Sequence, residues 1–162
     1  VFDPGIFSIG DTICDRDKKV KYKGIMTFAP EHFAEVEQID SMKRKQFAKG
    51  MDQIAKEGAI RIFCEPGSGL ERVYVGVVGE LQLDVLESRM KNEYNVDYRK
   101  YPQPYQFIKK VPEGVNPADL KLYEVKWVQD FHENNYLLFA SEWHIRHVLE
   151  ANEGLELCEF GE

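Results

Sequence analysis

The basic side chains between residues 43 and 56 are the clearest candidates for a binding surface. Lys43, Arg44 and Lys45 are consecutive, and Lys49 and Lys56 follow in the same predicted helical stretch. Ammonium and guanidinium groups on one face bind RNA phosphates and displace their counterions. We therefore predict a contact with RNA or with an acidic partner, and the alternative is a solvated outer helix face. Aromatic residues do not interleave with these cations, which argues against stacking on single-stranded bases.

The remaining residues predict no catalytic, cofactor-binding or metal-ligating group. The sequence has neither a Walker A motif nor a G-x-S-x-G nucleophile elbow, and Gly67-Ser68-Gly69 reads as a hairpin turn. His144 and His147 are three residues apart on a predicted helix, with Glu150 three residues further. No second helix offers a matching pair of ligands, so we interpret these histidines as solvated and predict no metal site.

Composition favours a globular protein without a membrane segment. Of the 162 residues, 43% are hydrophobic and 30% are charged, and no apolar run is long enough to span a bilayer. The net charge of −7 comes mainly from residues 101–162, with 5 Lys or Arg against 11 Asp or Glu. Cys14, Cys64 and Cys158 are widely spaced, which fits a reducing cytoplasm better than a disulfide framework.

Residues 23–103 have the clearest pattern of elements. Strands are predicted at 24–29, 59–64, 72–78 and 96–101, and helices are predicted after Asp40 and after Gly79. In the first helix Phe47, Met51 and Ile54 share one face. The second helix has an apolar stripe that consists of Leu83, Leu86, Met90 and Tyr94. We expect Leu81 and Val85 to widen this stripe. The order β-α-β-β-α-β predicts a ferredoxin-like unit.

The flanking segments complete an α+β fold. Residues 104–162 predict a second small α/β unit of the same domain, with strands at 105–111, 122–130, 136–140 and 155–160 and a helix after Ser141. Residues 1–22 alternate at Phe7 and Ile9 and again at Val20 and Tyr22, which predicts a short β tail, the last strands of a β-domain whose body lies upstream. We therefore expect the chain to be part of a larger protein.

Several segments together carry a family resemblance: 27–33, 45–59, 76–85 and 91–96. They resemble the C-terminal domain of bacterial peptide chain release factor 3, a family of translational GTPases, and residues 7–13 resemble the end of that family's barrel domain. Residues 78–83 are also similar to the third domain of elongation factor G. The segments 28–31 and 57–59 favour the release factor family, whereas Glu80 departs from its usual apolar residue.

The resemblance implies a role in translation termination. The parent GTPase would bind the ribosome after peptide release and promote dissociation of class-I release factors. GTP and magnesium would bind in an N-terminal domain outside this chain, so no catalytic residue is carried over. This piece would act as a rigid, monomeric body that contacts ribosomal RNA and ribosomal proteins. The alternatives are a free-standing ferredoxin-like module that binds a small regulatory ligand, or one that binds RNA.

Overall fold

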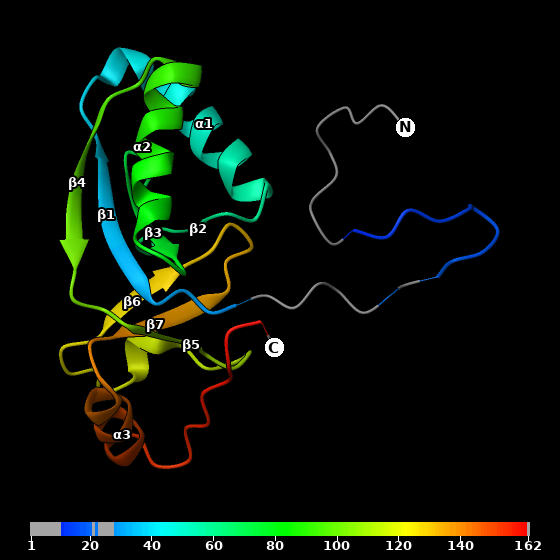
Figure 1. Ribbon diagram of the computed structural model, residues 1–162. Coiled ribbons are helices and arrows are strands. Elements are labelled where there is room, and N and C mark those ends of the chain that lie inside the picture. Colours follow the sequence, from blue (N-terminus) through cyan, green and yellow to red (C-terminus); the bar gives the residue numbers. More distant parts are fainter. Residues whose placement is uncertain (1–10, 21, 23–27, 162) are drawn as a thin grey trace.

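The computed structural model describes residues 11–20, 22 and 28–161 (Figure 1). Residues 11–20 contain a turn at Arg16 and Asp17. The strand predicted at Val20 and Tyr22 is wrong, since neither residue is in a strand, and the predicted strand residues Phe7 and Ile9 lie outside the described residues. The elements follow in this order: β1 (His32–Gln38), η1 (Ser41–Lys43), α1 (Arg44–Lys56), β2 (Arg61–Phe63), β3 (Arg72–Val77), α2 (Leu81–Tyr94), β4 (Tyr98–Gln103), β5 (Phe107–Lys110), η2 (Pro117–Asp119), β6 (Lys126–Gln129), β7 (Asn135–Phe139) and α3 (Glu142–Ala151).

The first six major elements form the ferredoxin-like unit. Its antiparallel sheet, called sheet A, has the strand order β2-β3-β1-β4. Val36 pairs with Val73 on one side and with Lys100 on the other, which fixes the register of the central strand. Helices α1 and α2 cover one face of this sheet (Figure 1). The predicted β-α-β-β-α-β order and the α+β class are therefore confirmed.

Alternation along the strands of sheet A builds the core beneath its helices. Every second residue of β3 points to the helix side, where apolar residues of β1, β2, α1 and α2 meet it. The buried members of this cluster are Val36, Phe47, Met51, Ile54, Ile60, Ile62, Val73, Val75, Val77, Leu86, Met90 and Val96. Such a dry cluster removes enough apolar surface from water to fix the two helices on the sheet.

A second antiparallel sheet, sheet B, has the order β5-β7-β6 and packs on the opposite face of sheet A. Tyr136 and Leu138 of β7 face Phe63 and Tyr74 of sheet A. Leu137 and the other alternating residues of β7 face α3 instead. Because β7 is buried on both faces, its sequence is a continuous apolar run and not an alternating one. The layers are α1/α2, sheet A, sheet B and α3 (Figure 1).

Three further predictions about individual strands and helix faces were wrong. Residues 28–29 of the predicted first strand are not in a strand, and 24–27 lie outside the described residues; the strand is His32–Gln38. The predicted closing strand at 155–160 is reduced to one bridge between Lys110 and Cys158. The α2 stripe is not widened by Leu81 and Val85, which are exposed, because residues two positions from Leu83 lie about 200° around a helix.

No described helix is long and apolar enough to cross a bilayer.

Candidate nucleic-acid interface

Helix α1 presents the basic residues because its opposite face is anchored in the core. Asp40 starts the segment, since its carboxylate accepts a hydrogen bond from the Met42 backbone N–H at 2.9 Å. Phe47, Met51 and Ile54 are then buried at helical spacing. The intervening positions must face solvent, and they include the predicted cations.

The first two cations of the predicted site hold α1 in place. The Lys43 ammonium donates to the backbone oxygen of Asn95, at the end of α2, at 2.6 Å. The Arg44 guanidinium lies 2.9 Å from a Glu71 carboxylate oxygen, just before β3. Lysine and arginine near a chain turn are well suited to such contacts with carbonyl and carboxylate oxygens. Lys43 and Arg44 therefore have partners within the fold.

Lys45 and Lys49 form the available part of the site. Both side chains are exposed and lie one turn apart on α1, and neither forms an ion pair within the described residues. Lys56 lies further along the same side, where its ammonium is 3.0 Å from Asp52. An exposed pair at this spacing is weak and opens readily to a competing anion. We define the α1 basic surface as Lys45 and Lys49.

Two carboxylates, those of Glu57 just after α1 and of Glu93 in α2, share one arginine. Arg89 of α2 donates to Glu57 and to Glu93, with 2.8 Å from its Nε to a Glu93 oxygen. The hydrogen bonds from Arg89 lower the pKa of both carboxyl groups. The hydrogen bonds to Glu93 and Glu57 in turn raise the pKa of Arg89. The cluster keeps one net negative charge, because two carboxylates share one guanidinium.

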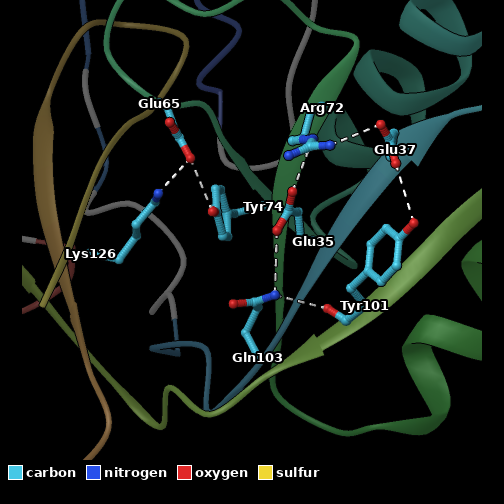
Figure 2. A network of polar contacts seen from close by, with 8 residues as sticks. All are labelled: Glu35, Glu37, Glu65, Arg72, Tyr74, Tyr101, Gln103 and Lys126. Carbon is cyan, nitrogen blue, oxygen red and sulfur yellow. Dashed lines mark hydrogen bonds and ion pairs between the residues drawn. The ribbon is translucent and has the colours of Figure 1, made fainter. Parts of the chain in front are cut away.

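The part of sheet A that faces away from the helices carries a self-satisfied polar network (Figure 2). Arg72 lies 3.0 Å from Glu35 and 2.9 Å from Glu37, and its hydrogen bond lowers the pKa of Glu37. Glu65 accepts from Lys126 of sheet B and, at 3.1 Å, from the Tyr74 hydroxyl. The hydrogen bond from Lys126 lowers the pKa of Glu65. This network joins the two sheets and offers no free cation.

The predicted helix histidines have partners of their own. His144 is 2.8 Å from the Ser141 hydroxyl and 3.3 Å from a Glu124 oxygen. Within the described residues, no group of three or more His, Cys, Asp or Glu side chains could hold a metal ion. His144, whose side chain is 15% exposed, is therefore not solvated as the sequence predicted.

A surface that sequence reasoning missed lies at the start of α2. Leu81 is 78% exposed, and Val78, three residues before it, and Val85, four residues after it, are exposed as well. The spacing of Leu81 and Val85 at i, i+4 is the available signal, because it places them together on the face opposite Leu83.

Comparison with known protein sequences places the chain in one family. Residues 22–149 match the model described as "Class II release factor RF3, C-terminal domain". The chain is 43% identical over 156 residues to the peptide chain release factor 3 of Symbiobacterium thermophilum. It is 35% identical over 157 residues to that of Gloeothece citriformis and 34% identical to that of a Cyanothece species.

These alignments cover nearly the whole of the present chain but a minor part of each relative. In the first three, 96% of this chain is aligned with 29% of the relative. The chain therefore spans about three tenths of the length of the curated relatives it matches. A family model over more than half of the chain, together with the confirmed fold order, shows the relationship: the chain belongs to the family of the C-terminal domain of peptide chain release factor 3.

Proposed function

We propose that this chain is the ribosome-contacting part of a translational GTPase that acts in termination. The larger protein would promote dissociation of class-I release factors, and GTP with magnesium would bind in a region outside this chain. The family match supports this assignment. The chain's own part is mechanical, because a four-layer body with two shared cores moves as a unit when attached domains rearrange.

The α1 basic surface is the part that meets ribosomal RNA in this proposal. The observation that carries it is the pair of exposed ammonium groups, Lys45 and Lys49, one turn apart and without an ion-pair partner in the described part of the chain. Each lysine placed near a phosphate would release about one counterion. Lys43 and Arg44 serve this surface indirectly, since they fix the start of α1.

The test is ribosome cosedimentation of the full 162-residue chain at several salt concentrations. Lys45→Glu/Lys49→Glu should weaken binding and lower the slope of log affinity against log salt by about one per lysine. The matched control is Lys91→Glu/Lys121→Glu, which changes the net charge equally at exposed lysines outside α1. We expect the control to retain binding.

A competition experiment separates specific from general binding. The 162-residue chain should be displaced from ribosomes by a full-length peptide chain release factor 3. Failure of that competition would contradict the proposed function. Equal loss of binding in both charge-reversal variants would instead show that the α1 basic surface is only a solvated helix face.

A further inference from the structure

Helix α3 lies at the opposite end of the molecule from α1 (Figure 1). Three ring side chains on and beside this helix are in contact with one another. The rings of Trp143 and His147 are stacked, with 5.0 Å between centroids and 7° between planes. Tyr123 meets His147 edge-on, with 5.7 Å between centroids. Trp143 is 52% exposed and Tyr123 is 53% exposed. We define the α3 aromatic surface as Tyr123, Trp143 and His147.

The core does not require these rings. Helix α3 is held on sheet B by Ile145 and Val148, which face the cluster under β7. Trp143 and His147 lie four residues apart on the other side of the helix. Large aromatic groups that remain half exposed while they stack on each other are typical of binding surfaces.

The surface is held rigid before any partner arrives. His144, next to Trp143, is fixed by the Ser141 hydroxyl at 2.8 Å and by Glu124 at 3.3 Å. Glu124 itself adopts a left-handed backbone with φ 51°, a conformation uncommon for a residue with a Cβ. Ordered rings lose little entropy on binding.

Negative charge surrounds the rings. Glu150 lines a hollow of about 170 Å³ together with Trp143, Arg146 and His147. Glu142 precedes Trp143 in α3, and both Glu142 and Glu124 are exposed. Three carboxylates thus lie close to these rings in the chain, with Arg146 and the exposed Lys121 as the neighbouring cations. Residues 101–162 as a whole have the same bias, with 5 basic and 11 acidic side chains.

We propose that the α3 aromatic surface binds a lysine- and arginine-rich segment of a partner protein. Cationic side chains would lie on the ring faces of Trp143 and Tyr123, where the π electrons attract them. Glu142 and Glu150 would pair with the flanking cations, while Glu124 keeps its contact with His144. This contact goes beyond the proposed RNA contact, because it lies on α3 and not on α1. It also selects a positively charged partner, whereas the α1 basic surface selects negatively charged RNA.

RNA fits this surface less well. Its bases stack on exposed aromatic rings, but its phosphates would have to approach the same three carboxylates. Single-strand binding surfaces combine stacking rings with a positive groove. Here the only cation among the residues lining the hollow is Arg146. We therefore assign a basic protein segment and treat an oligonucleotide as the competing probe.

The test uses the full 162-residue chain and a short fluorescein-labelled peptide of Lys-Gly-Arg-Ser repeats. Affinity is measured by fluorescence anisotropy at about 0.15 M salt, where weak long-range attraction is largely screened. Tyr123→Ala/Trp143→Ala keeps the net charge and should weaken binding about tenfold through loss of two cation–π contacts. Trp143→Phe keeps a ring and should retain most of the affinity, and circular dichroism checks that each variant is folded.

Matched charge variants separate the site from the overall acidity of the chain. Glu150→Gln should weaken peptide binding, whereas Glu113→Gln, an exposed carboxylate in another loop, should not. The two indole N–H signals in a nitrogen–proton spectrum give a direct map. That of Trp143 should shift with peptide, while that of Trp127, which donates to Asn135 at 2.8 Å, should stay in place.

Three results would overturn the proposal. They are no measurable peptide binding, binding that is unchanged in Tyr123→Ala/Trp143→Ala, and tighter binding of a fluorescein-labelled single-stranded RNA that depends on Trp143. The assay contains no ribosomes. Its failure therefore leaves the ribosome-binding result for the α1 basic surface standing, and the reverse also holds.

Discussion

At the scale of single residues, the hydroxyl of Tyr98 stands out because it is buried with no hydrogen-bond partner in the described part of the chain. The ring belongs to the core under the helices and meets Phe47 edge-on, with 6.5 Å between centroids. Burial raises the pKa of the phenol. A buried hydroxyl that loses water and gains no partner opposes folding, so the stabilising part of this side chain is its ring.

Removing that hydroxyl should stabilise the protein. Tyr98→Phe is expected to raise the free energy of unfolding by about 1 kcal/mol, measured by urea denaturation. Tyr74→Phe is the matched control, since the Tyr74 hydroxyl donates to Glu65 at 3.1 Å, and it should lower that free energy. Equal destabilisation by both changes would show that the Tyr98 hydroxyl is hydrogen-bonded.

The ion pair between Glu65 and Lys126 predicts a pH dependence. The hydrogen bond from Lys126 holds the folded-state pKa of Glu65 below its ordinary value of 4.5. The stabilisation is therefore complete above pH 4.5 and is lost as the pH falls through the lowered folded-state value. Glu65→Gln should be less stable than the parent at neutral pH, and the difference should shrink on acidification. A difference that stays constant below pH 4.5 would exclude this ion pair as its source.

At the scale of the elements, the contact between α1 and α2 depends on one glycine. A Cβ at Gly50 would lie 2.7 Å from the Met90 sulfur and 2.9 Å from Cγ of Tyr94. Both distances are far inside van der Waals contact. The missing side chain thus lets the two helices approach each other over sheet A.

Gly50→Ala places two effects in opposition. Alanine favours a helix over glycine by about 1 kcal/mol, whereas overpacking costs about 1–3 kcal/mol. We expect net destabilisation in thermal or urea unfolding. Gly79→Ala is the control, because its added Cβ meets nothing within 4 Å, and it should leave stability nearly unchanged. Stabilisation by Gly50→Ala would mean that the helices separate at little cost.

The elements also show what the sequence could predict. The helices and the β-α-β-β-α-β order along the chain followed from periodicity and from cap residues such as Asp40. Strand β1 was misplaced because Glu35 and Glu37 broke its apolar pattern, and their partner Arg72 is far along the chain. For the same reason the sequence identified the basic residues of α1 but not their pairing, which depends on contacts made only in the folded chain.

At the scale of the whole molecule, the two sheets share a core. Phe63 of β2 stacks edge-on with Tyr136 of β7, with 5.4 Å between centroids, and with Phe160 near the end of the chain. Backbone hydrogen bonds between Cys64 and Gln129 join β2 to β6, at 2.8 Å in each direction. The ferredoxin-like unit and the second unit should therefore unfold together.

Two optical probes can check this coupling. Both tryptophans, Trp127 and Trp143, belong to the second unit, whereas the helical circular dichroism comes mostly from α1 and α2. The two urea transitions should coincide. Phe63→Ala should shift both together by about 3 kcal/mol. If only the dichroism transition moved, the units would be independent.

The strand orders also determine when each sheet can be completed during translation. In sheet A the first strand, β1, is central, and it waits for β3 and then β4 before both of its edges are paired. In sheet B the last strand, β7, is central, and β5 and β6 have no common partner until it emerges. At a pace of about 5–20 residues per second, β5 has no strand partner until β7 is made, and β6 has only the backbone hydrogen bonds between Gln129 and Cys64. A nascent chain arrested before Asn135 would carry a complete first sheet whose Phe63 face is still open to chaperones.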